Sequence, residues 1–289
     1  MAIEIGTVEE LIAFGNGDYG RGSGSGNIEA VLTADLDFAD LTEYDIAYNW
    51  VGCRGDWYIN FDGQGHTIDN INYVGTWNWG FFGTLHSTSE VKNLNLTNMY
   101  VIGTGVGGIA QYCAGTTIQN CKVSGMLQGT ADVGGIIGNA GNPTSTVREC
   151  SVSGKLTSTS SSTRAGGICP TDSYTQVFNS IVVADISSNN YTTGIKGSGN
   201  TAINCEVRGT LKGASGRVGL FTFENATSVN CIAAVTSLRG GWYNASYNNC
   251  YMDSTLASAG GFSIPSGVTG ATTEELKDES WLRSHNFAI

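Results

Sequence analysis

Short alternations of apolar and polar residues recur along the chain between residues 58 and 255. Residues 122–127, 151–156 and 206–211 are near copies of one another, and in each a small or polar residue alternates with an apolar one. This period of two is typical of a strand with one buried face. No segment between residues 58 and 255 shows a comparable helical period, so the pattern predicts a region built from short strands.

Two series of residues recur in phase with these strands. In the first, a glycine precedes an apolar residue at steps of 22 to 32 residues; in the second, a small or apolar residue follows Asn or Glu at steps of 19 to 30 residues. The first, the glycine series, consists of Gly80, Gly108, Gly135, Gly167, Gly194, Gly219 and Gly241. The second, the cysteine row, consists of Leu94, Cys121, Cys150, Ser180, Cys205, Cys231 and Cys250. Periods of about 20 to 50 residues indicate a stacked repeat architecture.

The repeat has the length of one coil of a parallel β-helix. About 27 residues accommodate three short strands and their turns, and each coil would pair with its neighbours at about 4.8 Å. We therefore predict an all-β, single-stranded, right-handed parallel β-helix of about seven coils, the number of members in each series.

The cysteine row has a structural interpretation. Cysteine is small and readily buried, so it suits a tight inward corner, and the Asn before it can turn the chain through the left-handed region. The rival interpretation is a set of disulfides between adjacent coils. In-register stacking holds Cβ atoms about 5 Å apart, whereas a disulfide needs about 3.8 Å, so we expect free thiols.

Both ends of the stack need covering, because a parallel stack exposes unpaired sheet edges. At the N-terminus, Thr7 and Glu10 form a capping-box pattern that predicts a short helix through Phe14, followed by a strand at residues 28–38. We therefore expect residues 1–57 to form an N-terminal cap.

A second capping-box pattern, Thr272 and Glu275, predicts a helix that ends near Ser284. Three residues in or after this helix are expected to cover the last coil: Trp281, Leu282 and Phe287. The chain thus divides into the N-terminal cap, the β-helix repeats at residues 58–255 and a C-terminal cap at residues 256–289.

Composition narrows the classes of function. Lys and Arg number 14 and Asp and Glu 25, a net charge of −11, which argues against nucleic acid and anionic membranes as partners. Gly numbers 41 and Pro only 3, which excludes collagen and proline-rich disorder. No window reaches the ~18 apolar residues of a membrane span. The start of the chain has neither a basic nor an apolar leader region, so we expect no signal peptide.

Nothing in the sequence indicates a metal or a cofactor. The eight cysteines lack the paired spacing of a zinc site, and no histidine lies close to them. The three histidines, His66, His86 and His285, have no Ser or Cys in a nucleophile context. We therefore expect no metal, no cofactor and no catalytic triad, and we expect His66 to close the first coil.

Several segments resemble bacterial and phage proteins that carry the GLUG repeat. They are residues 59–68, which read INFDGQGHTI, the glycine-rich residues 133–138 and 218–221, and the closing residues 267–277. The likeness covers nearly the whole chain. It implies a β-helix and a place among surface adhesin-like and virion proteins, and it carries no shared catalytic motif.

One pair of carboxylates is compatible with glycan hydrolysis. Asp172 and Glu224 each follow a member of the glycine series at the same spacing, so they would occupy one surface row two coils apart. Two coils separate their backbones by about 9.6 Å, near the upper end of the range for inverting glycosidases. The alternative, which we favour, is a pair of solvated loop acids.

Six aromatic residues gather around the first coils and are the main surface candidates. They are Trp50, Trp57, Tyr58, Tyr73, Trp77 and Trp79. Trp77 and Trp79 are two residues apart, which would place both rings on one side of a strand. Three interpretations stay open: the rings seal the wide N-terminal end, form a subunit interface, or stack on a glycan.

These observations favour a non-catalytic structural protein of a bacteriophage virion, a fibre, spike or decoration component that contributes to assembly or host attachment. Its expected partners are other virion proteins, a second copy of the chain and a host surface glycan. We expect neither nucleic acid nor a membrane as a partner. The alternatives are a glycan-active hydrolase that uses Asp172 and Glu224, and a bacterial cell-surface adhesin.

Overall fold

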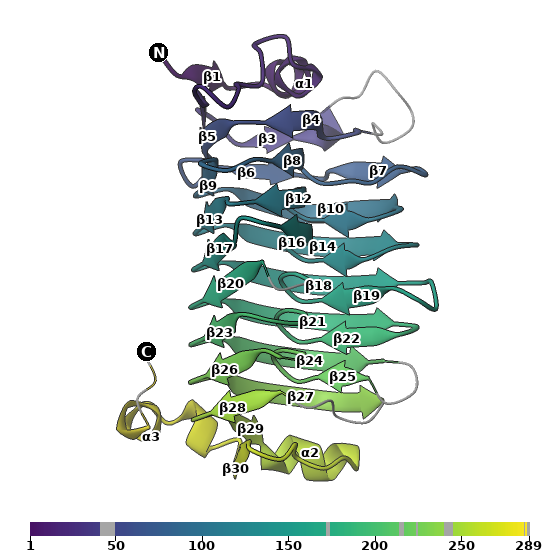
Figure 1. Ribbon diagram of the computed structural model, residues 1–289, viewed down its shortest axis with the longest axis vertical. Coiled ribbons are helices and arrows are strands. Elements are labelled where there is room, and N and C mark those ends of the chain that lie inside the picture. The colour runs from purple at the N-terminus through teal and green to yellow at the C-terminus, as the bar shows by residue number, and fades with distance from the viewer. Residues whose placement is uncertain are drawn as a thin grey trace.

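Strands stack along the long axis of the molecule (Figure 1) and pair in parallel. The structure is a computed structural model that describes residues 1–40, 50–171, 174–213, 217–223, 225–239, 245–285 and 287. It confirms the predicted fold class, because the chain is an all-β parallel solenoid of about eight turns with few helices.

Four sheets form the walls of the solenoid. The first sheet has the order β1 (Ile3–Ile5), β2 (Ile28–Leu32), β5 (Ile59–Asp62), β9 (Glu90–Lys92), β13 (Thr117–Gln119), β17 (Ser145–Arg148), β20 (Thr175–Phe178), β23 (Thr201–Ile203), β26 (Thr227–Val229) and β28 (Ser246–Asn248). The second has the order β3 (Leu36–Asp37), β6 (Thr67–Asp69), β10 (Asn95–Gly103), β14 (Lys122–Gly129), β18 (Ser151–Ser158), β21 (Ile181–Ser188), β24 (Glu206–Lys212), β27 (Ile232–Arg239), β29 (Tyr251–Asp253) and β30 (Thr269–Ala271), with β7 (Asn72–Val74) also paired to β10.

The other two sheets are shorter. The third has the order β11 (Val106–Gly107), β15 (Val133–Gly134), β19 (Arg164–Gly166), β22 (Tyr191–Thr193) and β25 (Val218–Gly219). The fourth has the order β16 (Ile137–Gly141), β12 (Ala110–Ala114), β8 (Phe82–Leu85) and β4 (Cys53–Trp57).

The solenoid begins before residue 58. Strands β2, β3 and β4 already pair with β5, β6 and β8. The region that we expected to be a separate cap, residues 1–57, is therefore in part solenoid. This early pairing accounts for a turn beyond the seven that the two series predict.

Apolar residues of similar size stack in rows inside the walls. Strands β14, β18, β21 and β24 pair residue for residue, which aligns Val123, Val152, Val182 and Val207. All four valines are at most 2% exposed, and fully burying such a side chain contributes about 1.5–3 kcal/mol. The alternation seen in the sequence is thus the alternation between core and solvent.

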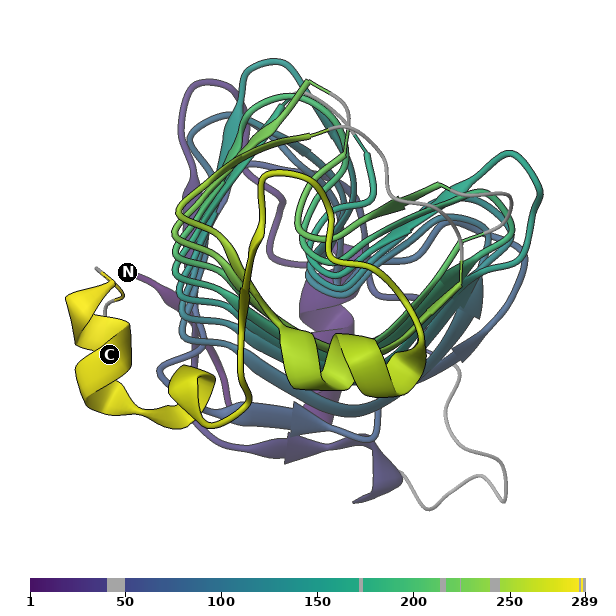
Figure 2. The same ribbon diagram turned by 90° about the horizontal axis from the view of Figure 1, so that it is seen from below.

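Members of the glycine series from Gly108 to Gly194 occupy one corner of successive coils. Gly219 departs from the predicted register, because it pairs with Thr193 and Leu220 takes the position that follows Gly194 in the stack. Gly241 lies outside the described residues. The corner lies between the third and fourth sheets, where the cross-section in Figure 2 is indented. A Cβ atom added to Gly108, Gly135, Gly167 or Gly194 would lie 2.0–2.2 Å from a carbonyl oxygen of the next coil. No side chain fits at that distance, so the close approach of successive coils is what requires glycine.

The cysteine row occupies a second corner, where the chain turns as predicted. The residue before each member of the row has a φ between 48° and 57°, in the left-handed region. All members of the row are at most 2% exposed, and the cysteines are free thiols. Each of the five thiols donates to the carbonyl oxygen two residues earlier at an S···O distance of 3.2–3.4 Å.

Replacing Cys205 by serine tests this corner. Ser180 already fills the same row: its Oγ donates to the Phe178 carbonyl at 2.8 Å and accepts from the Cys150 amide at 3.2 Å. We therefore expect Cys205→Ser to lower the free energy of unfolding in urea by less than about 1.5 kcal/mol. Cys205→Leu adds volume to a packed corner and should cost about 1–3 kcal/mol. A serine variant less stable than the leucine variant would contradict the assignment.

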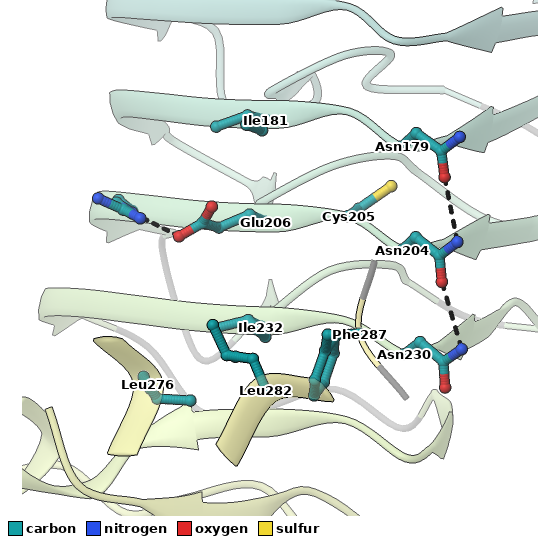
Figure 3. Close-up of a pocket in the computed structure, with 11 residues that line it drawn as sticks. Asn179, Ile181, Asn204, Cys205, Glu206, Asn230, Ile232, Leu276, Leu282 and Phe287 are labelled. Carbon is teal, nitrogen blue, oxygen red and sulfur yellow. Dashed lines mark hydrogen bonds and ion pairs between the residues drawn. The ribbon is translucent and has the colours of Figure 1, made fainter. Parts of the chain in front are cut away.

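Side-chain amides form a column along this corner (Figure 3). Asn204 Nδ2 donates to Asn179 Oδ1 at 3.1 Å, and Asn230 Nδ2 donates to Asn204 Oδ1 at 3.2 Å. Asn249 Nδ2 continues the column to Asn230 Oδ1 at 2.8 Å and also donates to the His285 carbonyl at 2.8 Å. The amides thus tie successive coils together and join the last one to the C-terminal segment.

Replacing Asn204 by aspartate removes one donor from the column. The carboxylate would face the Asn179 Oδ1 acceptor, so we expect a loss of about 1–3 kcal/mol in the free energy of unfolding at neutral pH. Asn225→Asp is the matched control, because Asn225 has the same backbone conformation, with a φ of 55°, and its side chain makes no hydrogen bond within the described part of the chain. Equal losses in the two variants would show that the column contributes nothing.

Helix α1 (Val8–Asn16) covers the N-terminal end of the stack. The expected capping box is confirmed, since Thr7 accepts from the Glu10 amide and the Glu10 side chain accepts from the Thr7 amide. The helix runs beyond Phe14 to Asn16, and its buried Phe14 ring lies 4.8 Å from the ring of Trp57.

The C-terminal end differs from the sequence expectation. The box of Thr272 and Glu275 forms, but it opens only the 3-10 helix η2 (Glu275–Lys277). A separate helix α3 (Glu279–Ser284) starts at Asp278, because the Asp278 carboxylate accepts from the amides of Ser280 and Trp281 at 2.7 and 3.0 Å. Helix α3 has no buried residue and lies beside the stack (Figures 1 and 2).

The end of the last coil is instead covered by α2 (Ser254–Gly260), a helix that we did not predict. Trp281, Leu282 and Phe287 therefore pack from the side; the Trp281 ring lies 5.1 Å from Tyr251 of β29. Another 3-10 helix, η1 (Phe38–Asp40), follows β3. Within the described ranges, no helix has both the length and the apolar character needed to cross a membrane.

Candidate functional site

The two carboxylates of the hydrolase alternative lie outside the described residues. Asp172 and Glu224 both fall in gaps of the described ranges.

The three histidines have structural surroundings. His66 Nδ1 lies 3.1 Å from Asp35 Oδ1, and His86 Nε2 lies 3.3 Å from Asp56 Oδ1. The His285 Nδ1 atom lies 2.8 Å from the Trp281 carbonyl and 3.0 Å from the hydroxyl of the adjacent Ser284. Among the described residues, no histidine combines a nucleophile on one side with a carboxylate on the other, which a triad needs.

The thiols are unsuited to nucleophilic chemistry. All eight cysteines are buried, and burial raises the pKa of the Cys53, Cys113 and Cys169 thiols. Since the thiolate is the reactive form, these three side chains stay protonated and act as small apolar groups.

Lys196 is a buried cation that the sequence did not reveal. It is fully buried, and its Nζ donates to the carbonyl oxygens of Ser198 at 2.8 Å, Gly197 at 3.3 Å and Gly199. Backbone carbonyls of its own loop thus solvate the ammonium group. The arrangement fixes the loop and leaves the cation inaccessible to solvent.

Most of the aromatic cluster belongs to the core. Trp50, Trp57, Tyr73 and Trp79 are at most 2% exposed. The Trp79 Nε1 atom donates to the Trp50 carbonyl at 3.1 Å, and the Trp57 Nε1 atom donates to the Cys53 carbonyl at 2.9 Å. These four rings belong to the core near the N-terminal end, in agreement with the sealing interpretation. Tyr58 is half-buried and stacks on His86 with the ring centroids 4.7 Å apart.

Trp77 is the exception, since 66% of it is exposed. The expectation that Trp77 and Trp79 share one face is wrong. Residues 75–78 form bends and irregular backbone rather than a strand, and Trp79 pairs with Val106 through an isolated bridge. The period of two therefore does not apply, and the two rings point to different environments.

A groove of about 310 Å³ lies beside Trp77. Strands β4, β8 and β12 contribute Arg54, Asp56, Thr84 and Gln111 to its lining, and Asn78 follows Trp77 at its edge. The Arg54 guanidinium carbon lies 5.4 Å from the centroid of the Trp77 ring. This Trp77 groove combines an exposed ring with charged, amide and hydroxyl groups, and we take it as the candidate site.

A second groove, of about 330 Å³, lies between the outer wall and the C-terminal segment (Figure 3). Leu282 and Phe287 face Ile232 of β27 across it, and Glu206 of β24 forms an ion pair with Arg208 at its rim. Apolar side chains of the wall and the C-terminal segment line much of this groove, which lies along the seam where that segment attaches to the stack.

The fold defines this chain as a parallel β-solenoid protein. No protein-family model matches it, so the GLUG-repeat resemblance stays a prediction. The sequence is similar to halomucin of Haloquadratum walsbyi, with 28% identity over 140 residues. The match covers 47% of this chain but only 2% of halomucin.

The fold is also similar to the crystal structure of a Bacteroides ovatus protein described as a "putative immunoglobulin A1 protease". The TM-score is 0.71 at 20% sequence identity, and the match covers 99% of this chain and 88% of that chain. At this identity the similarity shows the fold alone.

Proposed function

We propose that this chain is a non-catalytic, rigid display module that holds a binding surface at a fixed distance from its point of attachment. The observation that carries the proposal is the uninterrupted core, which runs from α1 to α2 as one apolar cluster. Stacked coils make a stiff rod, because each coil is hydrogen-bonded to the next along several sheets. In this proposal the buried thiols and Lys196 stabilise the rod and take no part in a reaction.

The setting that we propose is a phage virion, where the module would be part of a fibre, spike or decoration protein and would contact other virion proteins. A bacterial cell-surface adhesin is the second candidate. Its support is the match to a short stretch of the far longer halomucin, because it indicates that related sequence occurs as a module within a long chain. Antibodies against the chain separate the two settings: labelling of purified phage particles supports the first, and labelling of intact cells supports the second.

The absence of catalysis is tested directly with the purified chain. We expect no release of reducing ends from a panel of bacterial polysaccharides and no cleavage of immunoglobulin A1, the substrate in the name of the structural neighbour. If the chain depolymerises a polysaccharide and the Asp172→Ala/Glu224→Ala double variant does not, the hydrolase is the correct function and the display module is not. Cleavage of immunoglobulin A1 would likewise overturn the proposal.

A further inference from the structure

We propose that the Trp77 groove binds a neutral glycan and accommodates one or two sugar rings. The inference rests on the proposed display function and names the class of ligand that the module binds. Ligand sites begin at about 300 Å³, and this groove has about 310 Å³, so a short saccharide segment fits in it.

The exposed indole is the first observation. Trp77 is 66% exposed, whereas the other tryptophans of the cluster are at most 2% exposed. An exposed large aromatic ring leaves apolar area in water, and burying that area against the apolar face of a sugar ring is favourable. Arg54 lies against the same ring at 5.4 Å, so the cation–π contact holds the indole in place before a ligand arrives.

The polar groups around the ring are available for hydrogen bonds. Asn78 Oδ1 accepts from the Gly105 amide at 2.9 Å, which fixes the side chain, and its Nδ2 has no partner among the described residues. The side chains of Thr84 and Gln111 likewise make no hydrogen bond within the described ranges, and Arg54 makes no ion pair there. Sugar hydroxyls both donate and accept, and this set offers donors and acceptors side by side.

Glycines keep the floor of the groove open. Gly55 of β4 and Gly83 of β8 line the floor. A Cβ atom on Gly83 would lie 2.8 Å from the Gly55 carbonyl oxygen, so the two strands approach too closely for a side chain. The floor is therefore bare backbone at the irregularity between β4 and β8, and it has no side chain that must be ordered when a ligand binds.

The balance of charge favours a neutral ligand. Arg54 and Asp56 both line the groove and carry opposite charges, and Asp56 also lies 3.3 Å from His86 Nε2. The chain as a whole carries −11, which repels an anionic polysaccharide at long range. The two opposite charges can instead bind vicinal hydroxyls, with the guanidinium donating and the carboxylate accepting.

Saturation-transfer NMR and calorimetry with the whole chain test the proposal. The ligands are neutral di- and trisaccharides of glucose, galactose and mannose, and sialyllactose serves as the anionic probe. We expect binding of at least one neutral saccharide and at least a tenfold loss of affinity in Trp77→Ala. Gln111→Ala should weaken binding about threefold to tenfold, because one bidentate polar contact is lost.

Tyr100→Ala is the matched control. Tyr100 is 45% exposed on β10 and does not line the groove, so its removal deletes an exposed ring elsewhere and should leave the affinity unchanged. Urea unfolding of each variant shows that the fold is intact.

Three results would overturn the inference: no binding of any neutral saccharide, equal affinity in Trp77→Ala, or binding of sialyllactose alone. These failures leave the display function standing, because that function is tested by particle labelling and by the hydrolysis assays.

Discussion

Trp79→Ala should lower the free energy of unfolding by about 3–5 kcal/mol, the usual range for truncating a buried tryptophan. Trp79 is 1% exposed, and its ring lies 6.4 Å from that of Tyr73. The loss has two sources: a cavity at the wide end of the stack, and the Trp50 carbonyl, which loses its indole donor at 3.1 Å. Urea unfolding followed by circular dichroism measures it.

Trp77→Ala is the matched variant for this experiment. It removes the same side chain two residues away, but from an exposed position, so we expect the free energy of unfolding to change by at most about 0.5 kcal/mol. A Trp77 variant as unstable as the Trp79 variant would place both rings in the core and would remove the basis for the candidate site.

Gly167→Ala should destabilise the stack strongly, although it adds only one methyl group. The added Cβ would lie 2.0 Å from the Gly194 carbonyl oxygen and 2.8 Å from both γ-carbons of Val182. Because the obstacle is backbone of the next coil, two coils must separate for the methyl group to fit. We expect a loss of about 3 kcal/mol, at the upper end for an overpacked core, together with a lower yield of folded protein.

Gly26→Ala provides the control for the glycine corner. Its Cβ would have no neighbour within 4 Å, and its φ lies outside the left-handed region. Alanine there should leave stability unchanged or raise it slightly, since it restricts the unfolded chain. If Gly167→Ala unfolds at the same urea concentration as Gly26→Ala, then the coils are farther apart at the corner than the structure has them.

The stacked corners could be predicted from sequence because the same constraint recurs in successive coils. Only glycine fits where a Cβ atom would lie 2.0–2.2 Å from a carbonyl oxygen of the next coil, and residues that tolerate a left-handed turn precede each member of the cysteine row. Repetition turned these local constraints into two visible series. The right-handed winding of the coil stays a prediction.

The features that the sequence did not predict occur once each and break the repeat. Trp77 and Trp79 diverge because the chain bends where a strand was assumed. Helix α2 has a signal that could have found it, since Asp253 accepts from the Leu256 amide and Gly261 ends the helix in the left-handed region. The burial of Lys196 had no local sequence signal, because the oxygens at 2.8 and 3.3 Å from its Nζ are backbone carbonyls, which any sequence supplies.

The contribution of Arg54 to the candidate site was also hidden. Arg54 and Trp77 are 23 positions apart in the chain and lie on adjacent coils, where β4 pairs with β8. The pairing of β4 begins earlier than the repeat that the sequence displays, so the coil that brings the arginine to the tryptophan was assigned to the cap.

Because each coil touches only its neighbours, the length of the rod can change by duplication of a coil without redesign of its ends. A duplicated coil would bring its own glycine corner and its own Asn–Cys turn, and it would extend the column of amides by one member. The Trp77 groove spans β4, β8 and β12 near the N-terminal end, while the seam with the C-terminal segment involves β24 and β27. Gain or loss of coils between these two regions would change reach by about 4.8 Å per coil and leave both regions intact, so reach and recognition are separately adjustable traits of this chain.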